Sequence, residues 1–158
     1  MVTSSTAWTI SPFSTQKPVA PRERALVKDG VLKSYVLSAY SARRLGMETT
    51  GNAGGVSNLI VSHGEDDLAG LLRQMGNGLL VTDLMGFGVN IVTGDYSRGA
   101  TGFRVENGEI VHAVEEVTIA GNLKDMFASI VAIGADVDPN HSLRTGSVLL
   151  EGLTVAGK

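Results

Sequence analysis

The chain has 158 residues, 43% of them hydrophobic, which is enough for the core of one ordinary domain and argues against disorder. The formal net charge is −3 and no basic stripe is present, so a nucleic-acid partner is not expected. Because there is no cysteine, the chain has no disulfide framework, no thiolate metal site and no cysteine nucleophile, which fits a reducing compartment.

Nothing in the chain predicts an association with a membrane. No segment approaches the roughly 18 consecutive apolar residues that are needed to cross a bilayer. Residues 1–16 have neither the basic nor the apolar region of a secretory signal. We therefore expect a soluble, cytoplasmic protein.

The start of the chain differs in composition from the rest. Residues 1–17 are dominated by Ser and Thr and contain few large apolar side chains. We interpret residues 1–17 as a flexible N-terminal extension and residues 18–158 as one domain.

The first half of the domain combines strands with short helices. Two extended runs are predicted on either side of a hairpin turn at Asp29–Gly30. They are followed by a helix over residues 38–45, which Gly46 ends, and by a strand at Leu59–Val61. Apolar residues at helical spacing predict another helix over residues 65–75.

The second half is predicted to be mostly sheet. Strands are expected at Leu79–Met85, Val89–Thr93, Ala100–Val105, Ile110–Ile119 and Val148–Val155. Asn107–Gly108 is the strongest hairpin signal, because the tight turn requires positive φ at both positions. A helix beginning after Asn122 is expected to place five apolar residues on one face: Leu123, Met126, Phe127, Ile130 and Val131. The pattern predicts an α+β fold with a largely antiparallel or mixed sheet and two to three helices.

The residue patterns of common enzymes are missing. His63, His112 and His141 are scattered, and no His-Glu-x-x-His motif groups them, so we predict neither a metal site nor a catalytic residue. His112 and Glu116 could share one strand face, which we interpret as a solvated face.

Two glycine-rich patterns also fall short of known sites. Gly94–Gly99 is one residue too long for the nucleophile elbow of a serine hydrolase. The glycines of 51–55 and 86–88 lack a phosphate-binding motif and indicate turns or bulges.

One polar stretch is a candidate binding site. Asp95, Tyr96, Ser97, Arg98 and Gly99 are predicted to form a loop between two apolar runs, facing a substrate or partner. The role of Arg98 can be interpreted in two ways. It could form a salt bridge with Asp95, or it could bind a peptide carboxylate or backbone through its fork of donors.

Several motifs together resemble a known family. The run Gly94–Ile110, continued by Val111–Met126, resembles the C-terminal domain of PmbA/TldD proteins. Further similar motifs agree in order and spacing: Tyr40–Gly46, Thr50–Gly55, Leu80–Gly86 and Gly146–Gly157. The resemblance covers residues 18–158 and is specific, because several long motifs recur in sequence.

The resemblance implies a two-subunit protease that acts on unfolded or modified peptides. One subunit type, TldD-like, carries zinc on a His-Glu-x-x-x-His helix with a later cysteine, and the other, PmbA-like or TldE-like, lacks these ligands. This chain is more similar to the second type, because it has no cysteine and contains Leu84-Met-Gly-Phe-Gly88. Family members are about three times longer, as expected of multi-domain chains. Some are labelled modulators of DNA gyrase, a role that the acidic composition does not support.

We therefore expect the C-terminal part of a PmbA-like subunit that binds no cofactor, associates with a zinc-bearing TldD-like subunit and helps to shape a peptide channel. The alternative is a stand-alone binding or structural domain, or an inactive truncated gene product. Co-purification with a TldD-like subunit separates these hypotheses. Apolar runs in the predicted strands also predict self-association of the isolated chain.

Overall fold

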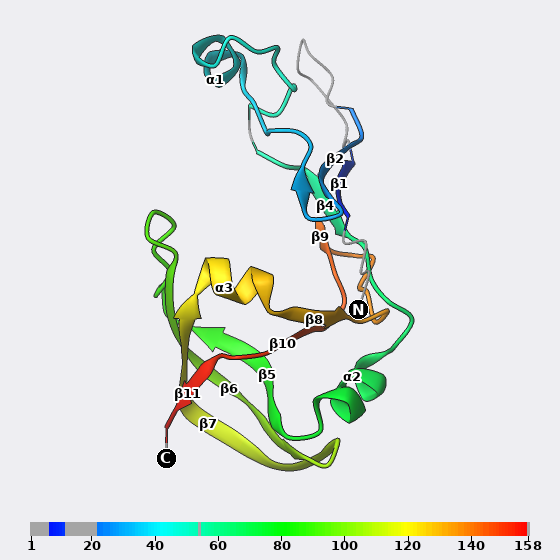
Figure 1. Ribbon diagram of the computed structural model, residues 1–158, viewed down its shortest axis with the longest axis vertical. Helices are drawn as coiled ribbons and strands as arrows, with labels where there is room; N and C mark the ends of the chain where they lie inside the picture. Colours follow the sequence, from blue (N-terminus) through cyan, green and yellow to red (C-terminus); the bar gives the residue numbers. More distant parts are fainter. Residues whose placement is uncertain (1–6, 12–21, 54, 158) are drawn as a thin grey trace. The chain divides into compact units, whose positions relative to one another are not determined.

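The computed structural model describes residues 7–11, 22–53 and 55–157, which cluster in two compact units (Figure 1). The first unit lies within residues 1–64 and 136–146, and the second within residues 65–135 and 147–158. The regular secondary structure of the described residues consists of three short helices and of mixed or antiparallel sheets. The predicted α+β class is therefore confirmed.

The first unit is built on a five-stranded sheet in the order β3-β2-β1-β4-β9. All neighbouring strands pair antiparallel except β4 and β9, which pair parallel. The strands are Trp8–Ser11 (β1), Arg24–Lys28 (β2), Val31–Leu32 (β3), Asn58–Val61 (β4) and Leu143–Arg144 (β9).

Strand β1 lies inside the segment predicted to be an extension. It pairs with β2 on one side and β4 on the other, and its Ile10 is buried. The local sequence gave no sign of this strand, because both of its partners are distant along the chain. The rest of the extension lies outside the described residues, so the division into residues 1–17 and 18–158 stays a prediction.

The turn and helix predicted for the first unit are confirmed. Asp29 and Gly30 have φ angles of 53° and 72° in the turn between β2 and β3. Helix α1, Ala39–Arg44, is capped by Ser38, whose hydroxyl accepts from the Ser41 N–H while the Ser41 hydroxyl accepts from the Ser38 N–H. Gly46 follows the helix with a φ of 64°, a conformation that ends helices and favours glycine.

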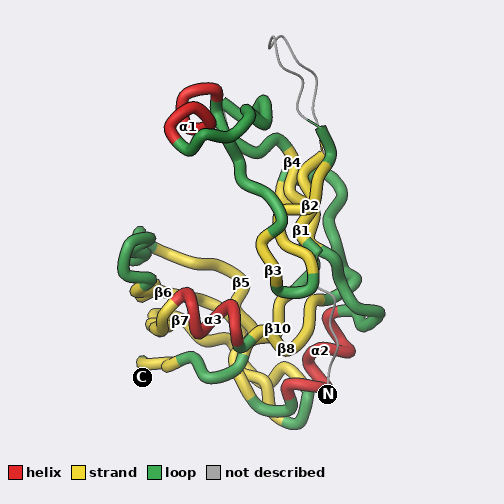
Figure 2. The backbone as a smooth tube through the Cα atoms, turned by 45° about the horizontal axis from the view of Figure 1, so that its top comes forward, coloured by secondary structure: helices red, strands yellow, loops and turns green. Residues whose placement is uncertain are grey.

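The second unit contains a four-stranded antiparallel sheet in the order β11-β7-β6-β5 and a separate antiparallel pair, β10-β8 (Figure 2). The large sheet consists of Gly78–Met85 (β5), Asp95–Glu106 (β6), Glu109–Asn122 (β7) and Thr154–Ala156 (β11). The pair consists of Ile130–Ile133 (β8) and Val148–Leu150 (β10). The helices are Leu68–Met75 (α2) and Leu123–Ala128 (α3).

The β6–β7 hairpin confirms the strongest turn signal in the sequence. Asn107 and Gly108 have φ angles of 51° and 81°, as the tight turn requires. The turn is tied to the end of α2, because the Gly108 N–H donates to the Gly76 carbonyl at 2.7 Å. The Asn107 N–H donates to Oδ1 of Asn77 at 3.1 Å.

Three element predictions in this unit need correction. Residues 89–93 form a bridge and a turn rather than a strand, since only Val89 pairs, with Tyr96. Ile130 and Val131 do not continue a helix, because α3 ends at Ala128 and Ile130–Ile133 pairs with β10. The predicted last strand is two strands, β10 and β11, separated by a turn in which Gly152 has a φ of 75°.

The core of the second unit lies on one face of the large sheet. Ala100, Val117 and Ile119 are buried, and partly buried apolar side chains from β5, β6 and β7 pack against them. Tyr96 is among these side chains, and this contact directs a residue of the candidate site toward the interior.

Candidate functional site

The five predicted site residues lie on strand β6 and not in a loop. Asp95–Gly99 pairs with Thr118–Asn122 of β7, which holds the segment extended. Side chains alternate along a strand, and accordingly Asp95 and Ser97 are exposed while Tyr96 and Arg98 are partly buried. The prediction of a loop is wrong, because cross-strand pairing was not visible in the local pattern. Whether these residues bind a substrate or partner stays a prediction.

The structure does not contain the salt bridge between Asp95 and Arg98. The Asp95 carboxylate accepts from the Thr93 hydroxyl at 2.6 Å, and Nη2 of Arg98 donates to the Leu84 carbonyl oxygen at 2.8 Å. Nε of Arg98 is buried without a hydrogen-bond partner. Arg98 therefore binds a backbone carbonyl, and in this structure that carbonyl belongs to the neighbouring strand β5 of its own sheet.

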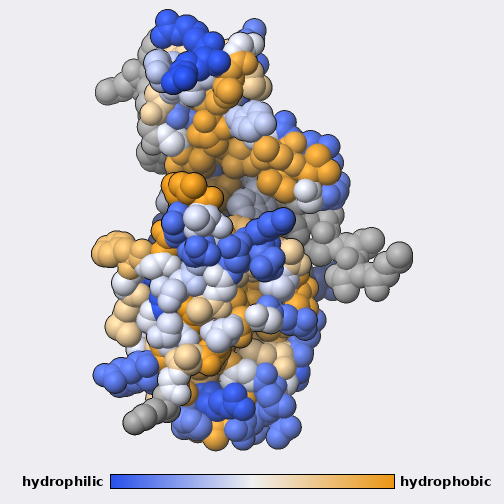
Figure 3. Space-filling view, turned by 60° about the vertical axis from the view of Figure 1, so that its left-hand side comes forward, coloured by the Kyte–Doolittle hydropathy of each residue, from blue (hydrophilic) through white to orange (hydrophobic). Residues whose placement is uncertain are grey.

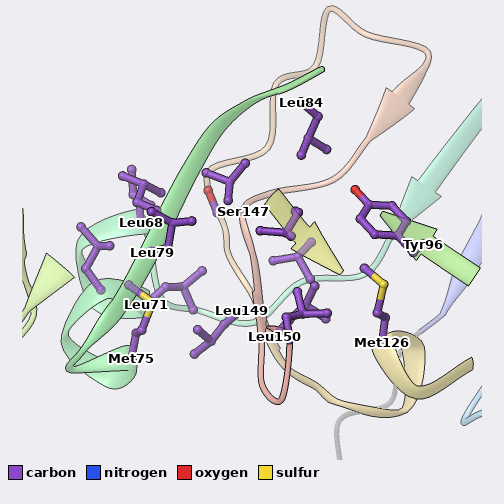
Figure 4. A pocket seen from close by; sticks show the side chains of 16 residues that line it. Leu68, Leu71, Met75, Leu79, Leu84, Tyr96, Met126, Ser147, Leu149 and Leu150 are labelled. Carbon is purple, nitrogen blue, oxygen red and sulfur yellow. The ribbon is translucent and has the colours of Figure 1, made fainter. Parts of the chain in front are cut away.

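Tyr96 lines an apolar pocket in the second unit with a volume of about 290 Å³. In Figure 4, Leu68, Leu71 and Met75 of α2 lie at one end, and Tyr96 and Met126 lie at the other. Helix α2 faces the pocket because its apolar residues recur at helical spacing. Asp67 caps the start of this helix, because its side chain accepts from the Gly70 N–H at 2.9 Å.

The lining of this pocket suits the binding of apolar groups. Fourteen of its sixteen lining residues are Leu, Val, Ile or Met, and the exceptions are Tyr96 and Ser147. An adjoining cavity of about 580 Å³ shares Met75, Leu79 and Leu149 with it and adds polar residues such as Gln74 and Asn77. Such a pocket can accept an aliphatic or aromatic side chain, but its lining holds no charged group for acid–base chemistry.

Strand β5 borders the pocket and forms one edge of the sheet. It pairs with β6, and no other described strand pairs with it. Its Leu79, Val81 and Leu84 line the pocket, and the register shifts between Val81 and Asp83. An edge of this kind can accept an extended segment through main-chain hydrogen bonds, with the side chains of that segment entering an adjacent pocket.

The residues present do not fit a zinc site. In the described ranges, no three His, Cys, Asp or Glu side chains are close enough together to hold a metal ion. His63 and His141 belong to the first unit and His112 to the second. The register shift of β7 between Val114 and Val117 also breaks the alternation on which a shared face for His112 and Glu116 depends.

The described residues of the glycine clusters 51–55 and 86–88 lie outside the helices. Gly51, Gly55 and Gly86 have positive φ angles, and neither glycine cluster opens a helix, which agrees with turns. Ser97 lies in a strand that continues to Glu106, so it does not occupy a strand-to-helix elbow. None of the helices in the described residues is long and apolar enough to cross a membrane.

Sequence reasoning missed the loop that joins β5 to β6. Residues 86–94 were partly predicted as a strand, because Val89–Thr93 is rich in β-branched residues. Phe87, Ile91 and Val92 are instead almost completely exposed. The available signal was an uncharged stretch from Leu84 to Gly94 with three glycines and an asparagine, which is typical of a structured loop.

Comparisons with known proteins agree with the motifs. Residues 3–157 match the model of the PmbA/TldA metallopeptidase C-terminal domain. A metalloprotease PmbA homolog of Haemophilus influenzae is 49% identical over 93% of this chain and 33% of its own length. A crystal structure from Bacteroides thetaiotaomicron, described as a candidate modulator of DNA gyrase, has a TM-score of 0.87 and 32% identity. It covers 98% of this chain and 37% of that one.

Two relatives from one organism, Buchnera aphidicola of Acyrthosiphon pisum, differ in their identity to this chain. Its metalloprotease PmbA homolog is 44% identical over 92% of this chain and 32% of its own length. Its metalloprotease TldD homolog is 22% identical over 87% of this chain and 29% of its own length. The chain thus spans about a third of the length of the curated relatives that it matches.

Proposed function

The chain belongs to the PmbA/TldD family as a metallopeptidase C-terminal domain, and we propose that it serves in the PmbA-like, or TldE-like, non-catalytic subunit of a two-subunit metalloprotease. The proposal rests on the sequence identity of the two Buchnera relatives. The PmbA homolog is 44% identical to this chain, and the TldD homolog is 22% identical. Its cysteine-free composition is compatible with the reducing cytoplasm, which is the location we propose.

The chemistry of the side chains supports a non-catalytic role for this chain. A catalytic zinc ion needs about three protein ligands that converge on one point. Among the described residues no three His, Cys, Asp or Glu side chains converge in this way, and the sequence has no cysteine. In the proposed complex a TldD-like subunit therefore binds the zinc ion, and this chain helps to shape the peptide channel.

The proposed substrates are unfolded or modified peptides in extended conformation. The edge strand β5 would bind the peptide backbone, which demands little of its sequence. The adjacent pocket would accept an apolar side chain of the peptide, the kind of group that folded proteins bury and unfolded ones expose. Asp95–Gly99 lies at one end of β6 beside this pocket, and in the proposal Tyr96 contacts the apolar side chain.

Reconstitution with a TldD-like subunit from the same genome tests this function. The chain, the subunit and their mixture would each be assayed for zinc by elemental analysis and for cleavage of casein and short peptides. We expect the two proteins to co-purify, with zinc in the TldD-like subunit and no cleavage by this chain alone. One equivalent of tightly held zinc in this chain, or chelator-sensitive cleavage by it, would contradict the proposal. A lack of co-purification would favour a stand-alone domain.

A further inference from the structure

The loop of residues 86–94 presents large apolar side chains to solvent. It connects β5 to β6 and projects beyond the ends of both strands (Figure 1). The exposed fractions of Phe87, Ile91 and Val92 are 103%, 87% and 90%. Single exposed apolar residues are common, but three on one short loop are typical of a surface that another molecule covers.

Backbone and asparagine hydrogen bonds hold the loop in place. Oδ1 of Asn90 accepts from the N–H groups of Val92 and Thr93, and the Gly94 N–H donates to the Asn90 carbonyl. Nδ2 of Asn122 donates to the Thr93 carbonyl at 3.1 Å. None of these bonds involves an apolar side chain, so the loop does not need Phe87, Ile91 or Val92 to keep its shape.

The hydrogen bonds that order the loop also favour binding. A loop that is already ordered loses little conformational entropy when its side chains enter a partner. Interface energy is also concentrated in a few apolar or aromatic anchors that become fully desolvated. Phe87, which is fully exposed on the same loop as Ile91 and Val92, has the properties of such an anchor.

The charge of the second unit favours a basic surface on the partner. No charged residue occurs from Leu84 to Gly94, and Asp83 and Asp95 bracket this stretch. The second unit as a whole has 11 Asp and Glu against 5 Lys and Arg, a formal charge of −6. Another copy of this unit would repel it, whereas an apolar pocket with a basic rim would attract it.

We propose that residues 86–94 dock this chain onto another protein subunit by inserting Phe87, Ile91 and Val92 into an apolar pocket rimmed by Lys and Arg. The assignment of that subunit as TldD-like rests on the proposed function. The chemistry of the docking surface rests on the exposure, rigidity and charge of the loop.

The test compares a loop variant with a matched control. Phe87→Ser, Ile91→Ser and Val92→Ser would be combined in one variant, and Val111→Ser, which changes an exposed residue of β7, serves as the control. Affinity for a TldD-like subunit would be measured by isothermal titration at two salt concentrations, and folding by circular dichroism. We expect the loop variant to fold and to bind at least about tenfold more weakly. The control should bind normally, and the wild type should bind less tightly in high salt.

The outcomes separate the two proposals. If the wild type does not bind the TldD-like subunit at all, the proposed function is wrong. The assignment of that subunit as the partner of the loop is then wrong as well. If the wild type and the loop variant bind equally well, the docking loop is wrong while the proposed function stands. If the loop variant loses only self-association in sedimentation, the occupant is a second copy, which also overturns the inference.

Discussion

The backbones of Gly88 and Ser97 are in direct contact. The Ser97 N–H donates to the Gly88 carbonyl at 2.7 Å, and the Ser97 carbonyl oxygen occupies the space that a β-carbon on Gly88 would need. Residues 86–94 can therefore close onto β6 only because residue 88 has no side chain. Ser97, predicted from the sequence as a binding residue, thus has a structural role through its backbone.

Gly88→Ala should destabilise the second unit. The added methyl group meets backbone atoms that cannot move aside cheaply, so we expect a loss of about 1–3 kcal/mol in the free energy of unfolding. Gly99→Ala is the control, because its β-carbon would make an ordinary 3.5 Å contact with Met85 and should change stability by less than about 0.5 kcal/mol. Urea unfolding measures both, and equal stability of the two variants would contradict the account.

Arg98→Met should weaken the contact between β5 and β6. The change removes the 2.8 Å hydrogen bond to the Leu84 carbonyl while keeping most of the apolar stem. We expect a loss of about 1–2 kcal/mol in unfolding free energy, reduced by the removal of the unpartnered Nε. Arg73→Met, at an exposed position on α2, is the control and should be close to neutral. A neutral Arg98→Met would show that this bond does not stabilise the sheet.

The features predicted correctly are those specified by neighbouring residues. The Asn107–Gly108 turn and the end of the first helix at Gly46 follow from backbone preferences of the residues themselves. The errors have two causes, a strand partner that is distant along the chain and hydrogen bonds within a loop. Asp95–Gly99 is a strand because β7 pairs with it, and Val89–Thr93 is not a strand because the bonds of Asn90 and Gly88 fold it into a loop. The pocket could not be predicted, since six separate segments line it.

Gly108→Val should destabilise the β6–β7 hairpin. Gly108 has a φ of 81°, which a β-branched residue rarely adopts, and a β-carbon there would lie 3.0 Å from the Arg73 Cα of α2. We expect a loss of at least about 1 kcal/mol in unfolding free energy. Asn107→Gly keeps a residue that tolerates positive φ and serves as the control. If thermal melts of both variants match the wild type, the role assigned to the turn is wrong.

The isolated chain should self-associate at micromolar concentration. Figure 3 shows that apolar side chains are exposed at the surface. Exposed large apolar residues among the described ones include Leu32 and Leu45 of the first unit. We expect binding of a hydrophobic dye and oligomers or aggregates, both relieved by co-expression with a TldD-like subunit. A stable monomer that binds no dye would favour a stand-alone domain.

Sedimentation velocity on a mixture with a TldD-like subunit tests the central claim most directly. We expect a faster boundary that contains both proteins and disappears when Phe87, Ile91 and Val92 are replaced by serine. Two independent boundaries, each with the sedimentation coefficient of the protein measured alone, would contradict the assignment of this chain as part of a two-subunit metalloprotease.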